Sequence, residues 1–322
     1  MKQSKFWNIW DKAGVVFILA FMIIVFGLID PQIIAPKQLL TALTRSAVTG
    51  IAAAGMVFAI CAGGFDLSVG AIMSLVGCVV AKLIVDSGMN TWLAILVGIG
   101  VAAVCGVVNG IIITKFKIQT FVATLATQLM FAGVALKYSD GYATQLTSKV
   151  NGSLKLLSTG SIAGIPMQLI LVVIVYLVAY VLYQYLPFGT KVRAIGSNET
   201  AARISGIKAD RTLIMVFVMT AVTAGMAAVL NVARLSTGNP TAGTGYELDA
   251  ITAVILGGTA MSGGKGNIWG TLMGAVLVTF VKMGLNMLNV GEAMQKMSIA
   301  LVLLIALSIS GLKIILQKEA EA

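Results

Sequence analysis

Histidine is absent from this 322-residue chain, and Asp, Glu, Lys and Arg together make up only 11% of it. Without histidine, neither a Ser–His nor a Cys–His pair can form, which excludes the common nucleophilic enzyme mechanisms. The three cysteines lie in separate apolar runs with no CxxC pair, so neither a disulfide framework nor a zinc site is expected. Lys265 follows a glycine, but Gly266 stands where a phosphate-binding loop requires Ser or Thr. We therefore expect that this chain alone is not an enzyme and binds no metal and no cofactor, ATP included.

Apolar residues dominate what remains. They account for 58% of the chain, and the mean hydropathy is +0.98, whereas a soluble domain carries roughly 25% charged residues. The composition predicts an all-α integral membrane protein with many spans, surrounded by membrane lipid. The net charge of +10 does not indicate nucleic acid, because the basic residues are spread over the connections between apolar runs. The first run, residues 13–29, lacks a small-residue cleavage site and is expected to be retained as a helix.

Ten apolar runs are candidates for membrane spans of about 20 residues. They cover residues 13–29, 46–63, 68–85, 91–114, 120–136, 166–186, 212–230, 250–261, 268–288 and 293–312. The run at 250–261 is too short to cross upright by itself. The count predicts a single transmembrane domain over residues 1–322, built from two five-helix halves. A weak similarity between 62–77 and 256–275, each a Gly-Gly break followed by a small-residue helix, would suit an inverted repeat.

The distribution of basic residues sets the expected orientation. With the N-terminus in the cytoplasm, thirteen of the 22 Lys and Arg residues fall in cytoplasmic segments and six fall outside. Lys82, Lys282 and Lys296 lie near the outer ends of spans, where a long side chain can reach the membrane surface. We therefore expect both the N- and the C-terminus in the cytoplasm.

Two stretches cannot continue as regular membrane helices. Residues 63–70 and 238–266 are rich in Gly and other turn-forming residues, and Arg234, Glu247 and Asp249 lie in or beside the second. Broken backbone at membrane depth is tolerated only inside protein or beside water, so both stretches are predicted to be broken or re-entrant segments near a solute pathway. The alternative for the second stretch is a polar external loop followed by a Gly-rich turn.

Polar residues in and near these breaks are the candidates for the translocation path or its gate. They are Asp66, Gln128, Asn231, Tyr246, Glu247, Asp249 and Asn286. For Asp66, a cap at the start of the following helix is favoured over a contact to the solute.

The longest charged connection, residues 187–211, has features of a docking element. Gly196-Ser197-Asn198 offers an N-cap for a short helix over Glu199–Ile204, which Ser205-Gly206 ends. We expect its small-residue face to lie in a groove on a soluble motor subunit. The residues expected to make this contact are Asn198, Glu199, Ala201, Ala202, Arg203, Ser205 and Gly206. The alternative is an ordinary cytoplasmic loop held inside by its positive charge.

Four segments resemble one known family. RAIGSNETAARISGI (193–207) is similar to the ATPase-docking segment of the ribose-type sugar permeases of bacterial ABC importers, and the segments at 63–71, 233–271 and 284–290 resemble the same family. The resemblance covers nearly the whole chain in order. It implies a multi-pass permease in the bacterial inner membrane that pairs with a second copy of itself. It also implies a separate cytoplasmic ATPase and a periplasmic or lipid-anchored sugar-binding protein as partners.

The sugar is less well specified by the resemblance. Residues 240–252 resemble the ribose permeases, so ribose is the first expectation, but permeases for other monosaccharides or for a furanosyl signalling molecule share the same motifs. Two other classes of protein stay open on the residues alone. An ion-coupled secondary sugar transporter would need ionisable groups in mid-membrane, which are scarce here. A structural or receptor-like scaffold would have no need of broken segments at membrane depth.

Overall fold

The computed structural model describes residues 5–147 and 152–291 together with residues 293–295, 297–301, 304 and 308. The tenth predicted span, 293–312, therefore lies largely outside the described residues, as does the C-terminus. The long helices are α1 (Lys5–Ile29), α2 (Pro36–Cys61), α3 (Val69–Val85), α4 (Thr91–Lys115), α5 (Thr120–Tyr138), α7 (Met167–Gln184), α10 (Ala209–Leu235) and α12 (Ile268–Met287). The short ones are a 3-10 turn (Pro31–Ile34), α6 (Gly152–Thr159), α8 (Pro187–Ser197), α9 (Glu199–Ile204) and α11 (Tyr246–Leu256).

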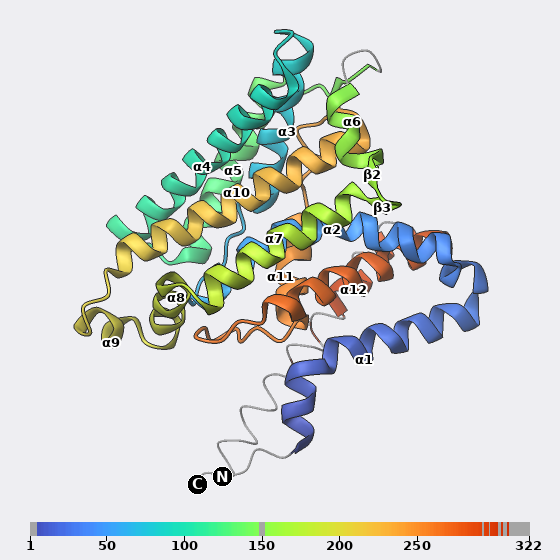
Figure 1. Ribbon diagram of the computed structural model, residues 1–322. Coiled ribbons are helices and arrows are strands. Elements are labelled where there is room, and N and C mark those ends of the chain that lie inside the picture. The colour runs from blue at the N-terminus through green and yellow to red at the C-terminus, as the bar shows by residue number, and fades with distance from the viewer. Residues whose placement is uncertain are drawn as a thin grey trace.

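The described helices confirm an all-α membrane architecture. Six of them (α2, α4, α5, α7, α10 and α12) are long and apolar enough to cross a membrane, and α1 and α3 contribute shorter apolar stretches. Two minimal antiparallel pairs, β1 (Thr144–Gln145) with β4 (Thr237–Gly238) and β2 (Ser161–Ile162) with β3 (Ile165–Pro166), join connections at one end. At the opposite end lie α8 and α9 (Figure 1).

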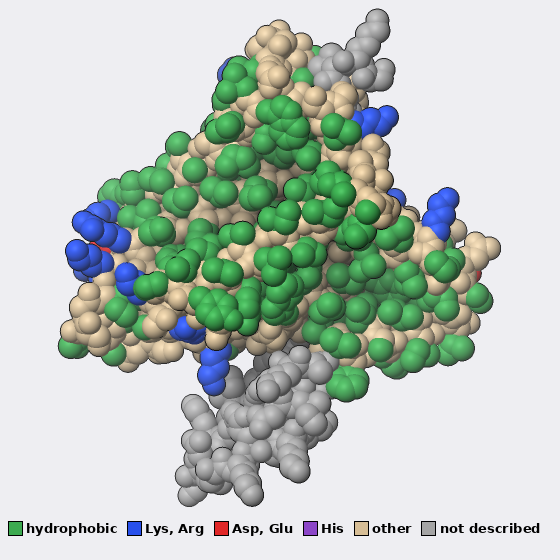
Figure 2. All heavy atoms as spheres, in the orientation of Figure 1, with side chains coloured by type: hydrophobic (Ala, Val, Ile, Leu, Met, Phe, Trp, Pro, Cys, Tyr) green, Lys and Arg blue, Asp and Glu red, His purple; other side chains and the backbone are tan. Residues whose placement is uncertain are grey.

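Helices α2 and α10 form the centre of the molecule. Every residue of α2 from Ser46 to Cys61 is buried, and α2 packs against α10, α12, α11 and α7. Small residues allow this close approach: a Cβ on Gly55 would lie 2.7 Å from the Thr220 Cα atom of α10. The three free cysteines, one each on α2, α3 and α4, are buried as well. The flanks of the molecule are covered with exposed apolar side chains, as a surface that faces lipid would be (Figure 2).

The packing of the central helices follows a repeat of two halves. Helix α10 packs on α4 and α3, and α2 packs on α12 and α11, which is the pattern expected if α2, α3 and α4 correspond to α10, α11 and α12. The predicted similarity between 62–77 and 256–275 does not fit this correspondence. The first begins in the connection between α2 and α3, whereas the second begins at the end of α11 and runs into α12.

Four helices differ from their predicted spans by more than two residues. Helix α1 begins at Lys5, eight residues before the predicted residue 13, and α10 covers 209–235 rather than 212–230. Helix α2 begins ten residues before the predicted residue 46, with Pro36 at the N1 position that proline favours. The prediction missed these first turns because Lys37 and Arg45 lower their hydropathy. Helix α11 covers 246–256 rather than 250–261. Its eleven residues extend about 16 Å, roughly half of the hydrocarbon thickness, so α11 is not a full span.

Candidate functional site

The first break, residues 62–68, is held in place by side chains from α4 and α5. Gly63 has a positive φ of 86° and turns the chain away from α2. Asp66 is fully buried and accepts hydrogen bonds from the Ser68 N–H (3.0 Å) and hydroxyl (2.6 Å). Asn109 of α4 donates to the Ser68 hydroxyl at 2.7 Å, and Thr124 of α5 accepts from the Leu67 N–H at 3.1 Å. Asp66 thus fixes the turn that leads into α3.

The second break comprises two segments on either side of α11. The first, residues 236–245, runs beside α3 in the opposite direction. A Cβ on Gly238 would lie 2.5 Å from the Ala81 Cβ atom, and one on Gly243 would lie 2.0 Å from the Gly70 carbonyl oxygen. The Gly243 N–H also donates to the Ser74 hydroxyl at 3.0 Å. These contacts show that the segment packs closely on a buried helix, as the prediction of a broken segment requires.

Buried carboxylates lie at the start of α11. The Glu247 carboxylate accepts the Gly245 N–H at 3.1 Å and is 3.5 Å from the amide nitrogen of Gln128 on α5. Asp249 forms an ion pair with Lys282 of α12. Both acidic side chains lie in the first turn of the helix, where the dipole stabilises negative charge. The arrangement presents carboxylate and amide groups beside a broken backbone, a combination suited to a polar solute such as a sugar.

Two other path candidates lie next to this group. Tyr246 directly precedes Glu247 at the start of α11, and its side chain interacts with Arg234 of α10. Arg234 also donates to Asn231 at 3.0 Å. Only Asn286, which is exposed near the end of α12, lies apart among the sequence-based candidates on the described helices.

Sequence reasoning missed three residues of this group. Gly70 and Ser74 of α3 contact the segment 236–245. No residue pattern in the sequence indicates these contacts, which only the folded structure shows. Lys282 was expected only to reach the membrane surface, but it pairs with Asp249 while its side chain stays 38% exposed. The signal that points to this pair is one Lys inside an otherwise apolar helix.

The connection at the opposite end folds into two helices rather than one. Helix α8 takes up residues 187–197, and α9 follows as predicted over Glu199–Ile204. Asn198 is the predicted N-cap, because its side-chain oxygen accepts the Ala201 N–H at 2.9 Å. Gly206 has a positive φ of 84° and ends the turn.

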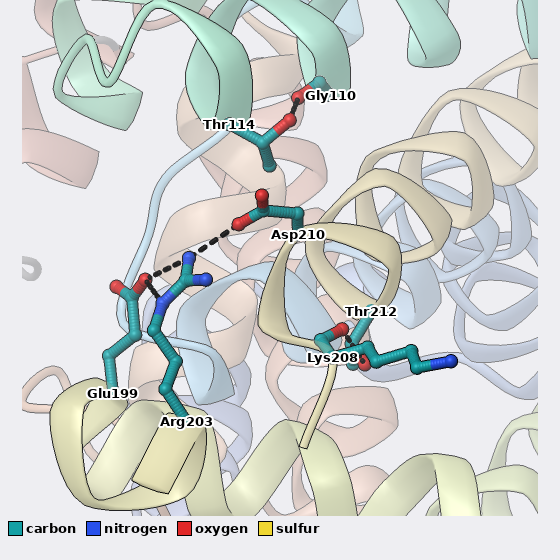
Figure 3. Close-up of polar contacts among 7 residues, drawn as sticks. All are labelled: Gly110, Thr114, Glu199, Arg203, Lys208, Asp210 and Thr212. Carbon is teal, nitrogen blue, oxygen red and sulfur yellow. Dashed lines mark hydrogen bonds and ion pairs between the residues drawn. The ribbon is translucent and has the colours of Figure 1, made fainter. Parts of the chain in front are cut away.

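An ion network fixes α9 to α10. The Arg203 guanidinium lies between Glu199 of its own helix and Asp210 in the first turn of α10, and both carboxylates accept its N–H groups (Figure 3). The hydrogen bonds to Asp210, which has the larger effect, and to Glu199 raise the pKa of Arg203 above its usual value. The Arg203 side chain therefore forms its ion pairs within the chain, although it remains 45% exposed.

One of the three small residues predicted to face a partner is turned inward, whereas Ala201 and Ser205 are exposed. Ala202 is buried against Ile195 of α8 and against Ala209 and Leu213 of α10, so it packs on its own chain and not on a partner. The exposed face carries Ile204, which is 84% exposed. Lys and Arg side chains gather over α9 and the start of α10 at this end of the molecule (Figure 2).

The described residues contain no group of three or more His, Cys, Asp or Glu side chains that could hold a metal ion.

Comparison with known proteins decides the family. The model of the branched-chain amino acid transport system/permease component family matches residues 38–307. The chain belongs to this family of ABC importer permeases. The permease is 40% identical over 306 residues, 95% of its length and 94% of the relative's, to the ribose import permease protein RbsC of Bacillus subtilis. It is 35% identical to the D-allose permease AlsC of Escherichia coli (90% and 88% covered) and 32% identical to the L-arabinose permease AraH of the same species (94% and 90%). No solved structure matches the chain.

Family membership places the permease among multi-pass inner-membrane proteins, in agreement with its six long apolar helices. It also accounts for the broken segments, which a scaffold would not need.

Proposed function

We propose that this permease imports ribose across the inner membrane, as the transmembrane subunit of an ABC importer. The observation that supports ribose as the sugar is the 40% identity to a ribose permease over nearly the full length of both chains. The identities to the allose and arabinose permeases are lower, at 35% and 32%. A separate ATPase drives the movement, and a binding protein delivers the sugar. The functional unit contains a second copy of the permease or a closely related chain.

The two ends of the molecule take different partners in this proposal. The end with α8 and α9 is cytoplasmic and meets the ATPase, with Ile204 as an apolar anchor on its exposed face. The end with α6 and the short strands is periplasmic and meets the binding protein. The N- and C-termini are cytoplasmic, in line with the basic residues around α8 and α9.

The sugar passes the start of α11, where Gln128 and Glu247 present hydrogen-bonding groups. Sugar hydroxyls both donate and accept, so a carboxylate beside an amide suits them.

The test is uptake of a panel of radiolabelled sugars by the permease reconstituted with its ATPase and binding protein. Ribose should be taken up faster than allose, arabinose, xylose or galactose. Gln128→Ala should slow ribose uptake, whereas Gln32→Ala, which changes an exposed glutamine in the 3-10 turn between α1 and α2, should not. Uptake of another sugar in preference to ribose would replace ribose in the proposal, and ATP-independent uptake would reject the importer.

A further inference from the structure

Three segments far apart in sequence meet backbone to backbone at the end of the molecule that carries α8 and α9. They are the end of α2 at Cys61, the last turn of α8 at Gly196, and the Gly-rich connection between α11 and α12 at Gly263 and Gly264. The Gly264 N–H donates to the Cys61 carbonyl at 2.8 Å. A Cβ on Gly196 would lie 1.8 Å from the same carbonyl oxygen, and one on Gly263 would lie 2.6 Å from the Gly196 carbonyl oxygen. No side chain fits between these backbones.

Tyr183, near the end of α7, joins the same three segments through its side chain. Its hydroxyl accepts the Gly266 N–H at 2.7 Å and lies 3.5 Å from the Cys61 sulfur. Arg193 of α8 lies over its ring, 4.8 Å from the centroid, and donates to the Tyr183 carbonyl at 2.7 Å. Phe58 of α2 packs edge-on against the ring. We call these residues, Cys61, Tyr183, Arg193, Gly196, Gly263, Gly264 and Gly266, the coupling junction.

We propose that the coupling junction carries the movement of α9 to α2 and to the α11–α12 connection, and that Tyr183 is its positioning residue. This inference rests on the proposed docking of an ATPase at α9. Only Asn198 separates α9 from the last residue of α8, so a displacement of α9 reaches Gly196 within three residues. Backbones in direct contact cannot slide past one another without a clash, because a packed interior is nearly incompressible.

The junction also explains where such a movement would go. Helix α2 leads from Cys61 directly into the first break with Asp66, and the α11–α12 connection follows the half-length helix that begins at Glu247. One input at α9 therefore reaches both broken segments. Without the Tyr183 hydroxyl, the Gly266 N–H loses its partner and the α11–α12 connection is free to shift relative to α2.

The experiment uses the complete importer, assembled from permease, ATPase and binding protein in lipid nanodiscs. Tyr183→Phe removes only the hydroxyl. We expect it to assemble with the ATPase, to melt only a few degrees below the wild type because one hydrogen bond is lost, and to keep the basal rate of ATP hydrolysis. Sugar transported per ATP hydrolysed should fall about tenfold, the change that corresponds to one buried donor left unpaired. Gly196→Ala, which forces a Cβ against the Cys61 carbonyl, should lose sugar-stimulated hydrolysis altogether.

Two matched controls come from the same chain. Tyr180→Phe removes a hydroxyl one turn earlier on α7, where it makes no hydrogen bond to a described residue, and Gly133→Ala adds a Cβ that meets no atom within 4 Å. Both should transport normally. Tyr183→Phe with a normal ratio of sugar to ATP would overturn the inference, and so would a loss of activity matched by an equal loss of assembly or melting temperature. A wild-type complex that does not import any sugar would instead reject the proposed function.

Discussion

Arg203 and Asp210 form an ion pair across the turn between α9 and α10, with the guanidinium nitrogen 2.5 Å from the carboxylate oxygen. If α9 docks on the ATPase as proposed, this pair matters more for the orientation of α9 than for the stability of the fold, because exposed ion pairs contribute only about 0–1 kcal/mol. Arg203→Gln should therefore lower the melting temperature by only a few degrees at most, yet reduce sugar-stimulated ATP hydrolysis. Lys191→Gln removes an exposed charge nearby that pairs with no described carboxylate, and it should leave hydrolysis unchanged. Equal effects of the two changes would show that charge, not the pairing, matters.

Ile204 offers a separate test of the docking face. It is 84% exposed, so Ile204→Ala should leave the stability of the isolated permease unchanged. In the assembled complex a buried aliphatic anchor contributes on the order of 1–2 kcal/mol, which corresponds to roughly tenfold weaker binding. The measurement is the affinity of the ATPase for permease nanodiscs. Ile162→Ala, on the other end of the molecule, should bind the ATPase normally; unchanged affinity for Ile204→Ala would place the motor elsewhere.

Gly70 is where α3 meets the start of α11. A Cβ there would lie 2.1 Å from a Glu247 carboxylate oxygen and 2.4 Å from the Gly243 carbonyl oxygen. Gly70→Ala should displace the re-entrant segment and lower the free energy of unfolding by about 1–3 kcal/mol, as overpacking does. Gly100→Ala adds a Cβ in open space within α4 and should be neutral or slightly stabilising. Thermal melting in detergent compares the two variants. Equal melting temperatures would mean that the segment around Gly243 can shift to accommodate the added Cβ without loss of stability.

Substitutions of Asp66 test whether its hydrogen bonds or its negative charge matters. Asp66→Ala removes the acceptor of two hydrogen bonds from Ser68, and we expect a loss of about 1–3 kcal/mol for each buried donor left unpaired. Asp66→Asn keeps an oxygen that can accept both bonds, and it should retain most of the stability and uptake. Protein level, melting and uptake are measured together. If Asp66→Ala lost uptake while melting like the wild type, the capping explanation would fail.

The location of the C-terminus is a further prediction. An alkaline phosphatase fusion after Ala322 should be inactive and a green fluorescent protein fusion at the same residue should fluoresce, because the basic residues sort to the cytoplasm. A fusion after Asn90, between α3 and α4, should show the reverse. Helix α11 alone is too short to cross, so this prediction requires residues 236–245 and α11 to complete one crossing together. Phosphatase activity after Ala322 would mean that they do not.

Much of the fold was available from hydropathy alone. The apolar runs that became α3, α4, α5, α7 and α12 begin and end within about two residues of their predicted bounds, because helices that cross the hydrocarbon must be apolar over a set length. The method failed for α2, whose first turns are the more exposed part of the helix and carry the exposed Lys37 and Arg45. It also failed for α8, whose short amphipathic sequence gave no run of sufficient length.

The site was less accessible to sequence reasoning. Glycine signals a close approach but does not name its neighbour, so Gly196 gave no indication that it would lie against Cys61, 135 positions earlier. The small residues of α9 were expected to face a partner, and tertiary packing instead turned Ala202 inward and Ile204 outward. The charged candidates were found because Glu247 and Asp249 are rare in an apolar chain, while their partners Gln128 and Lys282 required the fold.

The burial of all three native thiols has a practical consequence for labelling chemistry. Cys61, Cys78 and Cys105 are shielded from solvent in the folded chain, so maleimide reagents should leave the wild-type protein nearly unmodified. Single reporter cysteines can then be introduced at exposed positions such as Ile204 or Tyr142 without first replacing the native ones. Spin labels or fluorophores at such positions would follow the two ends of the molecule separately during a transport cycle. A native thiol that became reactive under turnover would mark a helix that opens.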